Sequence, residues 1–209
     1  ARDGTTKGLA KPTVSRTSDY MIGHFRAFQA ATGDRFWNTA IDRAYYLADR
    51  MQTVYSAGVG LMPDFVVGTD TATPHPSPGF LGDGNDNENK FWWNACRNPW
   101  RYASDYVLST DTRWKTVTSR MVGYFQKKVV AAGGDVTVIG TGYNLDGTIA
   151  TRGNSPAFMA PIILKTAVNP ARRAPAAGLA GPMGPRSAGR CSAATRPSDP
   201  AGATAPQLV

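Results

Sequence analysis

Cysteine and histidine are scarce in this chain, with two of each among 209 residues. Cys96 and Cys191 are too few for a disulfide framework or a cysteine metal cluster. His24 and His75 stand alone in the sequence, so neither has the neighbouring ligands that a zinc site requires. The sequence therefore predicts no metal site and no cofactor.

Long apolar runs are also missing, because no stretch approaches eighteen consecutive apolar residues. We therefore expect no membrane partner. The N-terminus has no charged segment followed by an apolar one, so a secretion signal is absent from this sequence. We nevertheless expect a secreted, extracellular protein because of the function argued below.

Clustered basic residues are absent despite a net charge of +8. Residues 1–169 carry 18 Lys/Arg against 14 Asp/Glu, and residues 170–209 carry five against one, so each part contributes +4. No helix-like segment combines Lys/Arg with aromatic residues along one face. We expect no nucleic-acid partner.

Glutamate is the rarest acid, since fourteen of the fifteen acidic residues are Asp and Glu88 is the single Glu. It lies in the segment 82–105, a polar loop that leads into an aromatic stretch with three of the five tryptophans: Trp92, Trp93 and Trp100. Indole rings stack on the apolar faces of sugars, and carboxylates, amides and guanidinium groups bind sugar hydroxyls. The pattern favours a carbohydrate site. The alternative is that the tryptophans are core or rim residues and the loop is a solvated connection.

Hydrophobic periodicity predicts helices in five places. The first two, with apolar residues from Tyr20 to Ala31 and from Phe36 to about Ala57, would form an antiparallel hairpin across Gly33. A third helix is expected to begin at Pro99 with Asn98 as its N-cap and to bury an apolar face of Trp100, Ala103, Tyr106 and Val107. Helices to Ala132 and over 155–168 follow. Residues 60–68 read as extended, and 69–89 as a long loop of the kind that is often functional.

The C-terminal forty residues differ sharply in composition. Ala, Pro and Gly make up 23 of residues 170–209, which contain no Phe, Trp, Tyr or Ile. Such a segment buries too little apolar surface to fold. The expected organisation is one domain over 1–169 and a disordered tail over 170–209.

Several stretches together resemble the C-terminal half of glycoside hydrolase family 8, across about residues 13–169. They are Arg16–Met21, His24–Phe28, Gly60–Phe65, Asn94–Arg101 and Gly142–Gly147. The resemblance implies an all-α fold, a partial (α/α)6 barrel of about three helical hairpins. It also implies an endo-acting, inverting hydrolase of a β-1,4-linked polysaccharide, either chitosan or a β-glucan such as cellulose, with a slight preference for chitosan because of the acidic loop.

The same resemblance implies the site residues. Many family members have a catalytic Asp where this chain has Asn94, and one branch with Asn there takes its general base from a Glu in the preceding loop, which would be Glu88. The expected substrate-binding residues are Trp92, Trp93, Asn94, Arg97, Asp19 and Tyr143. Should the base be another carboxylate, Asp83 and Asp86 are the nearest in the loop.

The family's general acid is a Glu in the N-terminal half, and no Glu precedes Glu88 here. We therefore expect a truncated enzyme that is inactive alone and self-associates through exposed half-barrel faces. The alternative from a different class is a carbohydrate-binding or scaffold fragment without turnover.

Overall fold

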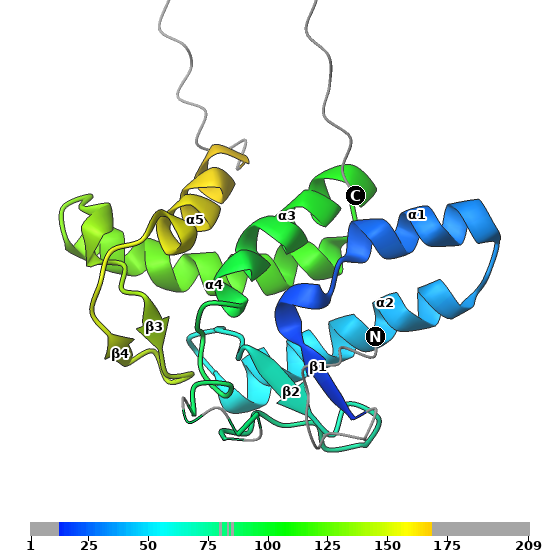
Figure 1. The fold of residues 1–209 in the computed structure, drawn as a ribbon. Coiled ribbons are helices and arrows are strands. Elements are labelled where there is room, and N and C mark those ends of the chain that lie inside the picture. The colour runs from blue at the N-terminus through cyan, green and yellow to red at the C-terminus, as the bar shows by residue number, and fades with distance from the viewer. Residues whose placement is uncertain (1–12, 80, 83, 85, 169–209) are drawn as a thin grey trace, which may run out of the picture. The chain divides into compact units, whose positions relative to one another are not determined.

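The computed structural model describes residues 13–79, 81–82, 84 and 86–168 (Figure 1). The predicted tail over 170–209 lies outside these residues. In the described part of the chain, no helix combines the length and the apolar character that a membrane crossing requires.

The first helical hairpin forms as its periodicity predicts. Helix α1 spans Ile22–Thr32 and helix α2 spans Phe36–Arg50, after which the chain makes a π-helical turn over Met51–Tyr55. Gly33 ends α1 with φ of 68°, a left-handed conformation that a residue with a side chain rarely adopts, and its N–H donates to the Gln29 carbonyl. The prediction of an antiparallel pair is confirmed.

The extended segment predicted over 60–68 contains a strand. Strand β2, Phe65–Val67, pairs antiparallel with β1, Val14–Arg16, in a register that places Ser15 opposite Val66. Because the strand begins directly after Pro63 and Asp64, those residues are held at the edge of a two-stranded sheet.

The second helical hairpin consists of α3, Asn98–Ser109, and α4, Thr112–Ala131. Asp111 caps α4, since its side chain accepts a hydrogen bond from the N–H of Arg113. The expected N-cap role of Asn98 is wrong. A 3-10 turn over Ala95–Arg97 precedes α3, so Asn98 is already helical, and its buried side-chain amide donates to Thr17 Oγ1 at 2.9 Å.

The apolar face expected for α3 is also partly wrong. Tyr102 and Ala103 are buried, whereas Trp100 and Val107 are exposed. The helix is therefore rotated relative to the prediction, and an indole is left on the surface at its N-terminal end.

The expected all-α class is wrong, because the chain also forms two antiparallel strand pairs. The second pair is β3, Gly142–Tyr143, with β4, Ile149–Thr151, and it leads into a single helix, α5, Pro156–Val168. The partial barrel of three hairpins is corrected accordingly: the described residues form two helical hairpins, one further helix and two small sheets (Figure 1). Short strands of two or three residues are too brief to show a period of two in the sequence.

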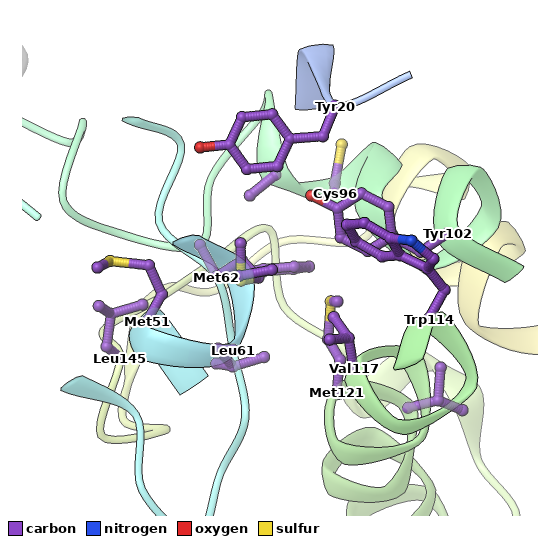
Figure 2. Close-up of a cluster of buried hydrophobic side chains, with 14 of the residues drawn as sticks. Tyr20, Met51, Leu61, Met62, Cys96, Tyr102, Trp114, Val117, Met121 and Leu145 are labelled. Atoms are coloured by element: carbon purple, nitrogen blue, oxygen red, sulfur yellow. The ribbon is translucent and has the colours of Figure 1, made fainter. Parts of the chain in front are cut away.

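The core lies where α2, α3 and α4 meet the segment that precedes β2. Trp114 of α4 is fully buried against Tyr102 of α3, with ring centroids 4.8 Å apart. Figure 2 shows other side chains that point into this core, among them Met51, Leu61, Met62, Val117, Met121 and Leu145. This packing fixes the position of residues 61–64, which carry the centre of the site described next.

Candidate functional site

Four segments that are distant in sequence are joined by backbone hydrogen bonds beside the core. The N–H of Thr17 donates to the Asp64 carbonyl at 2.9 Å, and the N–H of Asp64 donates to the Lys90 carbonyl at 2.8 Å. Phe91 and Tyr143 then exchange hydrogen bonds of 2.9 and 3.0 Å. The motifs around residues 17, 64, 94 and 143 are therefore brought into one region.

Asp64 is the centre of this region. Its buried carboxylate accepts hydrogen bonds from the N–H groups of Trp92 (3.1 Å), Asn94 (3.1 Å) and Ala95 (2.7 Å), and from the Asn94 side-chain amide (2.8 Å). Burial raises the pKa of Asp64 above its usual value, although these donors favour the charged form and oppose the shift. The carboxylate thus holds the whole turn over residues 92–95.

Trp92 holds the same turn from the other side. A Cβ placed on Gly142 would lie 1.8 Å from Cζ3 of the Trp92 ring, so the indole packs directly on the glycine backbone. Only glycine leaves room for this contact. Trp92 is half-buried, which makes it a packing residue as well as a predicted binding residue.

Trp93, Arg97 and Trp100 form the exposed face of this region. They are three and four residues apart and line a pocket of about 480 Å³ between the start of α3 and α5. Trp93 is 47% exposed and Trp100 is 42% exposed. The Trp93 ring meets Phe158 of α5 edge-on, with centroids 5.1 Å apart. The rest of the pocket lining is Cys96, Pro156, Ala157, Ala160 and Pro161.

Asp19 lies beside this face. Its carboxylate is 57% exposed and is 3.5 Å from the Arg16 guanidinium and 3.9 Å from that of Arg101. Arg101 also donates to the Ser18 carbonyl and lies near the ring of Trp100. Charged groups therefore continue the surface from Trp100 towards residue 19.

Glu88, the predicted general base, is 4% exposed. Its two carboxylate oxygens accept hydrogen bonds from the N–H groups of Gly79 (3.0 Å) and Leu81 (3.1 Å), and its carbonyl accepts from the N–H of Phe65 at 2.9 Å. The residue closes the long loop onto the start of β2. Asp86 is exposed in the same loop, and Asp83 lies outside the described residues.

Tyr143 lies apart from the exposed face. Its ring is fully buried among Phe91, Phe125 and Tyr124, and its hydroxyl accepts a hydrogen bond from the N–H of Gly140 at 2.6 Å. Burial raises the pKa of this hydroxyl. The side chain supports the site from within the core.

The structure thus brings together Trp93, Arg97 and Asp19 near one surface, and places Trp92 and Asn94 just beneath it. Asp64 was not among the predicted site residues, although a carboxylate inside the apolar stretch Gly60–Val67 was a usable signal, because buried Asp is rare unless its oxygens are paired. Trp100 was missed for a different reason: the helical pattern assigned it to the core. Within the described residues, no three His, Cys, Asp or Glu side chains are grouped as metal ligands.

Comparisons with known proteins agree on one class of enzyme. The chain is 38% identical over 161 residues to a beta-glucanase from Niallia circulans, and 31% identical over 155 residues to an endoglucanase from Bacillus sp. strain KSM-330. These alignments cover 77% and 74% of this chain but 37% and 32% of the relatives. A solved beta-1,3-1,4-glucanase from Paenibacillus sp. X4 matches with a TM-score of 0.66 and 37% identity, over 78% of this chain and 40% of that one.

The family assignment made from sequence motifs is corrected by these comparisons. No family model matches the chain, and the proteins that it resembles are named as a beta-glucanase, an endoglucanase and a beta-1,3-1,4-glucanase. Glycoside hydrolase family 8 is therefore withdrawn, together with the preference for chitosan. What stands is that the chain is similar to bacterial glucanases and spans between 32% and 40% of their length.

Proposed function

We propose that the surface formed by Trp93, Arg97 and Trp100 binds a β-linked glucan, as part of an endo-acting β-glucan hydrolase. The observation that carries the proposal is a pair of exposed indoles that line one pocket together with the side chain of Arg97. Water solvates the apolar faces of exposed indoles poorly, whereas the C–H faces of glucose rings pack well against them. Arg97 supplies donors for sugar hydroxyls, and the volume lies in the usual range for a ligand pocket.

The names of the relatives support a β-glucan in preference to other polysaccharides, and one of them is a beta-1,3-1,4-glucanase. A mixed-linkage or β-1,4-linked glucan is therefore the substrate that we propose. Such polymers are too large to enter a cell, so the proposed location of action is extracellular.

Glu88 is the proposed general base of an inverting hydrolysis, in which a carboxylate takes a proton from water on the side of the sugar opposite the leaving group. Within the described part of the loop, each oxygen of its carboxylate accepts one N–H, and a carboxylate oxygen has the capacity for a further bond from water. An inverting enzyme needs a second carboxyl group, from Asp or Glu, about 6.5–9.5 Å from the first, and we assign that role to no residue of this chain.

A binding module without turnover is the second candidate. The observation that favours it is the position of Glu88, which is buried and ties Gly79 and Leu81 to the rest of the loop. A purely structural carboxylate would have the same contacts. In that case the glucan surface would be retained and Glu88 would contribute to the loop alone.

The binding proposal is tested with the full chain by titrating its tryptophan fluorescence with soluble β-1,3-1,4-glucan, carboxymethylcellulose, chitosan and dextran. We expect a saturable response to the β-glucans and a loss of affinity of about tenfold in Trp93→Ala, since one lost stacking contact is worth up to about 1.4 kcal/mol. An equal response to dextran, or none to any polymer, would remove the proposal.

The catalytic role of Glu88 is tested in a chimera that joins the preceding part of the Niallia circulans beta-glucanase to this chain. Glu88→Gln should lower the release of reducing ends from β-glucan by about 10²–10⁴-fold, the usual contribution of a general base, with little change in affinity. Glu88→Gln also weakens the hydrogen bonds that hold the loop. Assays well below the melting temperature of the variant separate the loss of the general base from the loss of loop stability. Turnover close to that of the unmodified chimera would favour the binding module.

A further inference from the structure

We propose that Asp64 is a positioning residue that sets the orientation of Trp93 on the glucan-binding surface. The inference rests on the proposed function, because it explains how that surface is held rigid. Asp64 lies behind the surface and is 3% exposed, so it acts through its neighbours and does not contact the glucan.

The contacts of Asp64 surround Trp93 in the sequence. The residue before it, Trp92, donates its N–H to Asp64 Oδ1, and the residue after it, Asn94, donates both its N–H and its side-chain amide to Asp64 Oδ2. The Trp93 carbonyl in turn accepts a contact from Cys96 Sγ at 3.2 Å. The backbone of Trp93 is therefore held on both sides while its indole remains half exposed.

A carboxylate suits this position better than an amide of the same shape. An ionised Asp only accepts hydrogen bonds, and the groups that surround its oxygens all donate. An Asn would replace one oxygen with an NH₂ group that faces the N–H donors of the turn. Asp64→Asn should therefore displace the turn over residues 92–95, although the two side chains have nearly the same volume.

Gly142 supplies the opposing wall, because the Trp92 ring packs against its backbone. With the turn fixed between Asp64 and Gly142, the indole of Trp93 is oriented before a ligand arrives. Preorganisation of this kind raises affinity because less conformational entropy is lost on binding.

Asp105 is the matched control. It is also a buried aspartate, but its carboxylate binds Arg26 at the junction between α1 and α3, and Ser109 within α3, instead of the turn over residues 92–95. Asp105→Asn should lower stability without affecting the turn. Comparison of the two variants separates loss of fold from loss of orientation.

The experiment uses the full chain labelled with 5-fluorotryptophan, in which Trp93→Phe assigns the Trp93 resonance. We expect Asp64→Asn to shift the fluorine resonances of Trp92 and Trp93 and to weaken binding of β-1,3-1,4-glucan by about tenfold. Asp105→Asn should lower the melting temperature and leave both the resonances and the affinity unchanged.

The inference is overturned if Asp64→Asn leaves the Trp93 resonance unchanged, or if both variants lose affinity in proportion to their lost stability. Should Asp64→Asn not fold, Asn94→Ala removes the side-chain bond to Asp64 alone and must still shift the Trp93 resonance. If the unmodified chain binds no glucan, the proposed function falls, while the fluorine spectra still decide whether Asp64 orients Trp93.

Discussion

Two surfaces of this molecule expose aromatic side chains, and they differ in what supports them. At the tip of the α1/α2 hairpin, Trp37 contacts Phe25, Phe28 and Phe36, with ring centroids between 4.8 and 5.7 Å apart. On the other surface, Trp93 and Trp100 line a pocket together with Arg97, and the turn over residues 92–95 is bonded to a buried carboxylate. Exposed rings alone do not indicate a ligand site, whereas rings with polar partners and a fixed backbone do.

The two regions are also held in place by different interactions. Within α1 only Ile22 is buried, and Arg26 of this helix contacts Asp105 of α3 and Asp111 at the start of α4. The turn over residues 92–95 is held by buried hydrogen bonds and by close packing on Gly142. The stability contributed by the Arg26 ion pairs should therefore depend on pH and salt. The stability of the turn should depend instead on the size and shape of the side chains packed against it.

The largest effect is expected at Gly142. Gly142→Ala places a methyl group inside the Trp92 ring, and the overpacking should lower the free energy of unfolding by about 3 kcal/mol. Urea denaturation measures the loss. Gly123→Ala in α4 is the control, since a Cβ there meets no neighbouring atom and should add about 0.5–1 kcal/mol. Equal effects at the two glycines would show that the Trp92 contact is unimportant.

The next effect concerns charge beside Asp64. Asn94→Asp replaces a donor 2.8 Å from Asp64 Oδ2 with a second carboxylate. Two carboxylates this close repel each other when both are ionised, so the pair retains one proton to a higher pH than a free carboxyl group does. The pKa of the pair is therefore raised in the folded state. Stability should accordingly be retained at low pH and fall by about 2 kcal/mol as the pH rises to 7.

Thermal melts between pH 3 and pH 8 test this prediction. Asn38→Asp, at an exposed position of α2 where solvent and salt screen the added charge, is the matched change. The account fails here if Asn94→Asp is as stable as the unmodified chain at pH 7.

A smaller effect is expected for Arg26→Ala, which removes contacts of 2.9 Å to Asp105 and 2.8 Å to Asp111. Because the guanidinium is one-third exposed, solvent screening limits the expected loss to about 1–2 kcal/mol. Hydrogen bonds from Arg113, and secondarily from Arg26, lower the pKa of Asp111 to about 2. This lowered pKa stabilises the fold above about pH 4, and the contribution is lost as the pH falls towards 2.

Denaturation at several pH values measures the difference in the free energy of unfolding between Arg26→Ala and the unmodified chain. This difference should become smaller below pH 4 and at high salt. A difference that is constant across pH and salt would mean that Arg26 acts through packing of its aliphatic stem.

The smallest effect on folding is expected at Leu108, which is 82% exposed near the end of α3. Leu108→Ser should change the free energy of unfolding by less than about 0.5 kcal/mol. It should nevertheless reduce the self-association that we predict from the exposed apolar residues, as measured by sedimentation velocity. A monodisperse monomer before any substitution would contradict that prediction.

The sequence predicted the helices well because their apolar residues recur over three or more turns, as from Phe36 to Met51. It predicted the extended segment that contains β2 but not β1, β3 or β4, since strands of two or three residues form through pairing with distant segments, as Val14 pairs with Val67. The assignment of Trp100 to the core failed for a related reason. The direction of α3 is set by the preceding 3-10 turn, and the bond from Asn98 to Thr17 is a tertiary contact.

For the site, sequence alone located the region between Glu88 and Arg101 by its residue types. It could not show that Glu88 is bonded to the N–H groups of Gly79 and Leu81, or that Tyr143 is buried. Asp64 was overlooked because most of its partners are backbone amides, so the one signal in the sequence was its place in the apolar stretch Gly60–Val67.

The central claim is that one of the two aromatic surfaces, and not the other, binds β-glucan. Its most direct test is electrophoresis of the full chain through gels that contain β-1,3-1,4-glucan, with Trp93→Ala compared against Phe36→Ala, which removes a ring that is 62% exposed at the hairpin tip. The account predicts that Trp93→Ala loses most of the retardation, about a tenfold loss of affinity, while Phe36→Ala is retarded like the unmodified chain. Equal losses in both variants, or a loss in Phe36→Ala alone, would contradict it.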